Sequence, residues 1–111
     1  MNLYFNDEPL STACYNEKAG VRRWGSARAA VIRRRILQIL TAPSVADLIR
    51  MGPLLFQSGP EPDHFHVDAS APQRIILIPM HDPIPRDGTG SLVYADITDV
   101  CLLEIRELHA R

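Results

Sequence analysis

The chain has 111 residues, of which 46% are hydrophobic and 23% are charged, so it holds one domain with its own core, spanning residues 1–111. This composition excludes a two-domain protein and an intrinsically disordered one. The formal net charge of −1 is far from the positive excess that gives non-specific nucleic-acid binders their affinity. Any site for a polyanion must therefore be local.

The charges are unevenly distributed along the chain. Residues 1–17 carry three acidic residues, residues 18–59 carry eight basic and one acidic, and residues 60–111 carry nine acidic and four basic, giving −3, +7 and −5. Eleven of the twelve basic residues are arginine, whose planar guanidinium suits bidentate contacts to phosphate or carboxylate. The bias favours specific anion contacts on the central third of the chain.

The cysteines and the apolar segments indicate the cellular compartment. Cys14 and Cys101 form neither a CxxC pair nor a framework of several disulfides, and we expect both to be reduced. No apolar stretch approaches the ~20 residues that span a bilayer, and the first residues lack the basic start and apolar block of a signal peptide. We expect a cytoplasmic protein without a membrane partner.

The N-terminal part of the chain is predicted to be one short strand followed by helices. Residues 2–5 are β-prone, and a turn then leads into a helix of roughly residues 9–18, which Gly20 is expected to end. From residue 21 to residue 41, apolar residues recur at helical spacing and predict one long helix. In such a helix, Arg22 aligns with Arg33 and Arg23 with Arg34, which predicts a basic flank outside the apolar arc.

Further along, a short helix over residues 45–50, capped by Ser44, is followed by segments with a period of two. Residues 64–69 alternate between apolar and polar, which predicts a strand with a wet face. Residues 74–78 are nearly all apolar and predict a central strand covered on both faces.

Residues 97–107 alternate again, which places Cys101, Leu103 and Ile105 on one side of a strand and Leu102 on the other. Because the helices come first and the strands later, we predict an α+β fold with N-terminal helices packed on a small antiparallel β-sheet. A parallel α/β fold is disfavoured.

Several of these residues could cleave RNA. Cleavage through the 2′-hydroxyl needs a base, an acid and cations for the charge that builds on phosphorus, and it needs no metal. The candidates are Arg74 at the start of the central strand, His64 and His66 on the wet strand face, and Glu107 with His109 after the last strand. If the β segments are neighbours, these side chains converge on one face, where Arg74 can grip a phosphate.

Each candidate also has a purely structural interpretation, which the sequence leaves open. Arg74 can sit at a strand end and pair with Asp68 or Glu104, and histidines on a wet face are usually solvated. His109 is two residues from the C-terminus, where fraying is the default. The arginines of the long helix can form a solvated face.

No metal or cofactor is predicted. No other histidine stands at metal-ligand spacing beside His81 and Asp82, and residues 88–90 lack the lysine and helix of a phosphate-binding loop. A serine or cysteine nucleophile paired with histidine stays open, although no motif indicates one.

Segments along nearly the whole chain carry a family resemblance. They are residues 18–25, 37–42 with 45–48, 65–68 six residues before Arg74, 82–86, and 100–105 leading into 107–109. In their order and spacing they resemble the RelE/ParE superfamily of bacterial toxins, specifically the HigB-like plasmid-maintenance killer proteins.

The resemblance implies a small α+β toxin that cleaves mRNA on the ribosome and is neutralised by a helix-turn-helix antitoxin. Such a toxin would meet a DNA operator only through that antitoxin. It also implies that Arg74 holds the scissile phosphate and that His109 with Glu107 forms the acid/base group. We add His66 as a second proton-transfer candidate. We take the flank formed by Arg22, Arg23, Arg33 and Arg34 as the electrostatic footprint for RNA.

The chain departs from the family pattern at several positions: Leu55 replaces a histidine, Ser58 a lysine and Leu108 an aromatic residue, and residues 61–63 replace a stretch that is normally basic or neutral. These departures favour an alternative, a toxin-fold binding protein without nuclease activity that inhibits DNA gyrase or acts as a co-repressor with its antitoxin. In either case, we expect the antitoxin to contact the basic helix, because the acidic C-terminal third would repel an acidic inhibitor.

Overall fold

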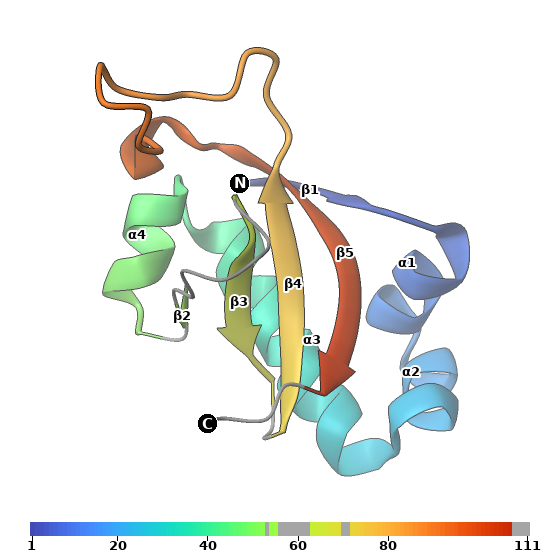
Figure 1. The fold of residues 1–111 in the computed structure, drawn as a ribbon. Helices are drawn as coiled ribbons and strands as arrows, with labels where there is room; N and C mark the ends of the chain where they lie inside the picture. Colours follow the sequence, from blue (N-terminus) through green and yellow to red (C-terminus); the bar gives the residue numbers. More distant parts are fainter. Residues whose placement is uncertain (53, 56–62, 70–71, 108–111) are drawn as a thin grey trace.

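A computed structural model describes residues 1–52, 54–55, 63–69 and 72–107 (Figure 1). Most helices and most strands form separate runs along the chain, which is typical of an α+β fold. The elements in chain order are β1 (Asn2–Phe5), α1 (Glu8–Tyr15), α2 (Glu17–Trp24), α3 (Ser26–Thr41), α4 (Val45–Arg50), β2 (Leu54–Leu55), β3 (Phe65–Asp68), β4 (Gln73–Pro79), the 3-10 helix η1 (Tyr94–Asp96) and β5 (Asp99–Glu107).

The five strands form one mixed sheet in the order β1-β5-β4-β3-β2. Strands β2 to β5 pair antiparallel, but β1 pairs parallel with β5. The prediction of an antiparallel sheet is therefore wrong at this edge. The reason is connectivity: a short turn forces neighbouring strands to run antiparallel, whereas nearly the whole chain separates β1 from β5 and leaves their relative direction free.

Helix α3 covers one face of the sheet and supplies much of the core. It lies behind the strands in Figure 1 and buries Ala29, Ile32, Ile36 and Ile39. Strands β3, β4 and β5 meet it with apolar side chains that are fully buried, Phe65, Val67, Ile75, Leu77 and Leu102. Among the helices of the described residues, none is both long and apolar enough to cross a membrane.

The helix breaks differ from the predicted ones. Gly20 does not end a helix; it is buried inside α2, where an added Cβ would stand 2.7 Å from the carbonyl oxygen of Ala13. It permits α1 and α2 to pack closely. The breaks fall at Asn16, whose side chain caps α2, and at Gly25, whose φ of 83° favours glycine. The predicted helix of residues 21–41 is thus split between α2 and α3.

Strand β5 contains one irregularity that changes which residues face the core. The register pairs Ile76 with Glu104 but Leu77 with Leu102, so Leu103 is an extra residue in β5. Leu102 and Ile105 consequently contact the same core, although unbroken alternation predicts opposite sides for them. Local patterning cannot reveal such a bulge, because the bulge is defined by the partner strand.

Candidate functional site

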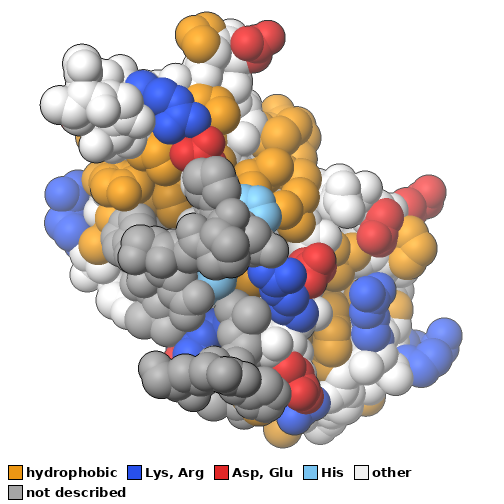
Figure 2. Space-filling model, in the orientation of Figure 1, with side chains coloured by type: hydrophobic (Ala, Val, Ile, Leu, Met, Phe, Trp, Pro, Cys, Tyr) orange, Lys and Arg blue, Asp and Glu red, His pale blue; other side chains and the backbone are white. Residues whose placement is uncertain are grey.

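The sheet face turned away from α3 carries charged and histidine side chains, which lie side by side in Figure 2. Cross-strand pairing arranges them in two rows over β3, β4 and β5. One row is His66, Ile76 and Glu104, and the other is Asp68, Arg74 and Arg106. We call the five polar residues of these rows, His66, Asp68, Arg74, Glu104 and Arg106, the polar face.

Arg74 is paired with Asp68, one of the two carboxylates with which a purely structural arginine was expected to pair. Its Nη1 donates to Oδ1 of Asp68 in an ion pair across β3 and β4. The Arg74 side chain is 16% exposed and that of Asp68 is 43% exposed. The buried Nε of Arg74 has no hydrogen-bond partner among the described residues. A guanidinium has five N–H donors, so the ion pair leaves donors on Arg74 that Asp68 does not occupy.

Arg106 stands directly opposite Arg74 in the pairing of β4 with β5. Its Nε lies 3.4 Å from Oε1 of Glu104, and its side chain is 34% exposed. Like charges directly opposite each other destabilise a sheet, so each arginine is kept beside a carboxylate. Two neighbouring guanidinium groups are also well suited to bind one phosphate. Arg106 is not among the residues predicted from the sequence, because its place beside Arg74 depends on the register between β4 and β5.

His66 is buried, which corrects the prediction that it lies on a wet face. It belongs to β3 and is 5% exposed, and its cross-strand neighbour Ile76 is 1% exposed. The alternation of residues 64–69 indicates a strand correctly, but both faces of that strand are covered. His66 stands diagonally from Arg74, a relation that spans about 7–8 Å between Cα atoms. His64, just before the strand, is half-buried.

Arg35 is a second arginine beside this face that was not predicted from the sequence. Its Nε donates to the backbone oxygen of Asp68 at 2.7 Å, and its Nη1 donates to Gln38 Oε1 at 2.9 Å. Asp68 is thus contacted at its backbone from α3 and at its carboxylate from β4. The end of β3 is fastened on both sides, which fixes the position of the Arg74 partner.

Glu107 does not join the polar face. It ends β5 opposite Gln73, whose Nε2 donates to Oε1 of Glu107 at 3.2 Å. Because side chains alternate along a strand, Gln73 and Glu107 belong to the sheet face opposite that of Arg74. The expected convergence of Glu107 with Arg74 is therefore not met. His109 lies outside the described residues.

Ser58 and Leu108, which differ from the family pattern described above, also lie outside the described residues. Leu55 is described in its backbone and pairs directly with His66 in the register of β2 and β3. Leu55, where the family that the sequence resembles has a histidine, is thus a cross-strand neighbour of His66.

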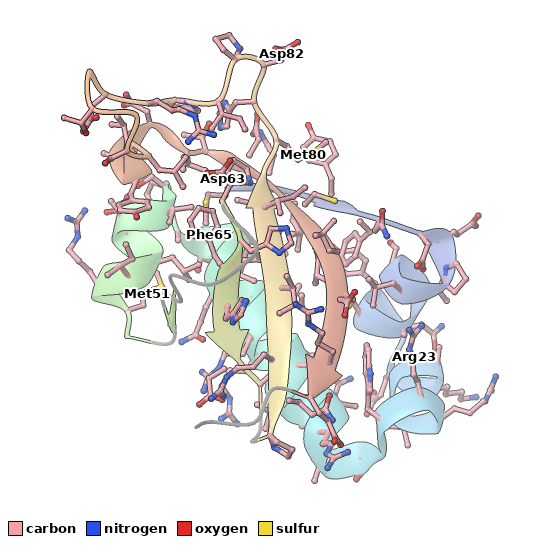
Figure 3. All side chains as sticks on the ribbon, viewed as in Figure 1. Arg23, Met51, Asp63, Phe65, Met80 and Asp82 are labelled. Atoms are coloured by element: carbon pink, nitrogen blue, oxygen red, sulfur yellow. The ribbon has the colours of Figure 1, made fainter. Side chains whose placement is uncertain are left out.

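The basic flank expected on one long helix is divided by Gly25. Arg22 and Arg23 belong to α2, and the guanidinium of Arg23 lies 5.7 Å from the centre of the Trp24 ring. Figure 3 shows Arg23 on α2, to one side of β3 and β4. The predicted alignment with Arg33 and Arg34 is lost, because it assumes an unbroken helix through residue 25.

Arg33 and Arg34 lie on α3, on the other side of the sheet from Arg74. Arg34 is exposed and stands two residues from both Ile32 and Ile36, which places it on the side of α3 opposite the sheet. These arginines therefore do not surround the same phosphate as Arg74.

The described residues place neither a metal cluster nor a reactive thiol beside this face. Histidine, cysteine and acidic residues nowhere gather in a group of three or more that could hold a metal ion, within the part of the chain that is described. Cys14 and Cys101 are both free and buried. Burial raises the pKa of the Cys14 thiol to about 12, against a smaller lowering by Arg23, and burial also raises the pKa of Cys101. Neither forms a thiolate nucleophile near neutral pH.

Comparison with protein families, curated proteins and solved structures gave no match to this chain.

Proposed function

We propose that this chain is a HigB-like toxin of the RelE/ParE superfamily, which cleaves mRNA on the ribosome and is neutralised by a helix-turn-helix antitoxin. The observation that carries the proposal is the cross-strand pair of Arg74 and Arg106 on one sheet face. The order of helices and strands along the chain and the segments quoted above also support it. Contact with a DNA operator is assigned to the antitoxin alone.

In this proposal the polar face binds the scissile phosphate. The phosphate bridges Arg74 and Arg106, which relieves the repulsion between the two guanidinium groups and exchanges their carboxylate partners for a stronger bidentate ligand. Negative charge grows on the phosphate oxygens as the 2′-hydroxyl attacks, so both arginines stabilise the transition state more than the ground state.

Two proton transfers complete the proposed reaction. A base removes the proton of the 2′-hydroxyl, and an acid protonates the departing 5′-oxygen. We assign these transfers first to His109, and to His66 second because its imidazole is buried beside the arginines. Glu107 belongs to the opposite sheet face and takes no proton-transfer role in this proposal.

The proposal is tested by replacing the two arginines singly. Arg74→Ala and Arg106→Ala should each lower mRNA cleavage by about 10²–10³-fold, the usual loss when one charge-stabilising donor is removed. Mapping of RNA 5′ ends after induction, together with growth curves, measures the effect. The matched control is Arg50→Ala on α4, where an exposed arginine pairs with Asp47 away from the sheet. Unchanged cleavage by a folded Arg74→Ala variant would contradict the assigned role.

A specific observation supports the alternative of a toxin-fold binding protein without nuclease activity. Arg74 is 16% exposed and ion-paired, and His66 is buried, so the polar face has few groups directly available to substrate. RNA mapping separates the two proposals. Cuts within codons support the nuclease, whereas a DNA-damage response without mRNA cuts supports gyrase inhibition.

A further inference from the structure

An apolar groove lies between α1 and α3, away from the polar face. It has a volume of about 180 Å³ and is lined by Cys14, Tyr15, Arg33, Ile36, Leu37 and Leu40. Cys14 and Ile36 are buried, whereas Leu37 is 62% exposed, Tyr15 is 56% exposed and Leu40 is 37% exposed. The groove thus has a buried apolar floor and exposed apolar walls.

The exposed walls are not explained by the core. Helix α3 packs on the sheet through Ile32, Ile36 and Ile39, and Leu37 and Leu40 extend the apolar surface beyond that contact. Exposed apolar side chains that gather around one groove form a candidate interaction site. The volume of about 180 Å³ is below the ~300–1,000 Å³ of small-molecule pockets. It therefore fits apolar side chains of a protein segment better than a small ligand.

The charges around the groove specify the partner. Leu37 stands one helical turn after both Arg33 and Arg34, and residues 18–41 contain seven basic residues and no acidic one. The Nη1 atom of Arg33 lies 3.6 Å from Oε2 of Glu17, whose side chain is 74% exposed. A surface ion pair of this kind contributes little to stability, so Arg33 can readily exchange it for an incoming carboxylate.

We propose that this groove binds an acidic amphipathic helix of a partner protein. Two apolar side chains spaced three or four residues apart would fill the groove between Tyr15, Leu37 and Leu40. Acidic residues one turn away would then face Arg33 and Arg34, as in other helix-in-groove interfaces. A stable complex buries at least about 1,000 Å², so the partner must continue along the exposed side of α3 beyond the groove.

This inference does not depend on RNA cleavage, because the groove and the polar face lie on different sides of the sheet. The test uses the full chain and two synthetic peptides of about 18 residues, a length that can form a helix. Both carry leucines at the same helical positions; one carries glutamates where the other carries lysines. Fluorescence anisotropy should show at least about tenfold tighter binding of the acidic peptide, a gap that narrows at high salt. Equal binding of both peptides, or binding of neither, would overturn the proposal.

Two variants test whether the acidic peptide binds in the groove. Leu37→Asp should weaken binding of the acidic peptide at least about tenfold, because it puts a charge into the apolar wall. The matched control is Val21→Asp, which adds the same charge at an apolar residue of α2 that is 37% exposed and does not line the groove. Circular dichroism checks that both variants fold.

Two results with these variants would refute the groove assignment. One is equal binding by the Leu37→Asp and Val21→Asp variants. The other is a concentration-dependent dimer that Leu37→Asp dissociates, seen by sedimentation, because the occupant would then be a second copy of this chain.

Discussion

Asp68 has two opposing effects on Arg74. Its carboxylate neutralises a guanidinium that is 16% exposed, and it also competes with any anion that Arg74 would bind. Asp68→Asn should therefore lower the free energy of unfolding by about 1–3 kcal/mol, the usual cost of leaving a mostly buried polar group poorly partnered. The same change should raise the affinity for a short RNA oligonucleotide at low salt.

Urea denaturation and fluorescence anisotropy measure the two effects separately. Asp47→Asn serves as the control, since Asp47 pairs with an arginine on the surface of α4. A loss of stability without any gain in RNA affinity would mean that Asp68 positions Arg74 for binding rather than competing with the ligand.

His81 fastens the long segment between β4 and β5. Its Nε2 accepts hydrogen bonds from the backbone N–H groups of Thr98 at 3.1 Å and Asp99 at 3.2 Å. His81→Phe removes this acceptor and should destabilise the fold by about 1–2 kcal/mol in thermal or urea unfolding. His81→Gln, which keeps a side-chain acceptor, should recover part of the loss. Equal stability of the Phe and Gln variants would show that the acceptor contributes nothing.

At the level of the helices, two glycines should be intolerant of substitution for different reasons. Gly20→Ala would place a methyl group 2.7 Å from the carbonyl oxygen of Ala13, and we expect a loss of about 1–3 kcal/mol from overpacking. Gly25→Ala meets no neighbouring atom but must adopt φ 83° and ψ 162°, a region that is essentially restricted to glycine, at a cost of about 1–3 kcal/mol.

Gly88→Ala is the matched control for both glycine variants, since Gly88 has neither a positive φ nor an atom within 4 Å of an added Cβ. Chemical denaturation of the three variants measures these effects. Wild-type stability of Gly20→Ala would show that α1 and α2 separate without cost.

The helices also show how far local patterning extends. The helix over residues 45–50 with its Ser44 cap is confirmed, and the Ser44 hydroxyl accepts a hydrogen bond from the N–H of Asp47 at 3.3 Å. The apolar run of residues 74–78 is the centre of β4. These elements were predictable because their signals, caps and apolar periodicity, lie within a few neighbouring residues. The Gly20 break was wrong because the residue contacts another helix.

Over the whole molecule, the candidate site was predictable only in part. The spacing of the apolar segments identified Arg74 as the charged residue at the start of a central strand. This spacing did not reveal that Arg106 and Arg35 lie near Arg74, and it predicted His66 on a solvent-exposed strand face. Each of these depends on which strand or helix lies next to which, and the pairings join residues more than 30 positions apart, such as Arg35 with Asp68 and Arg74 with Arg106.

The sequence alone therefore determines the α+β class, the order of helices and strands, and the concentration of positive charge on residues 18–59. Only the tertiary structure decided that β1 runs parallel to β5, that β5 carries an extra residue, and that Arg33 and Arg34 of α3 lie on the other side of the sheet from Arg74. The physical reason is that local propensity and periodicity act over a few residues. Strand direction, register and burial depend on contacts between distant parts of the chain.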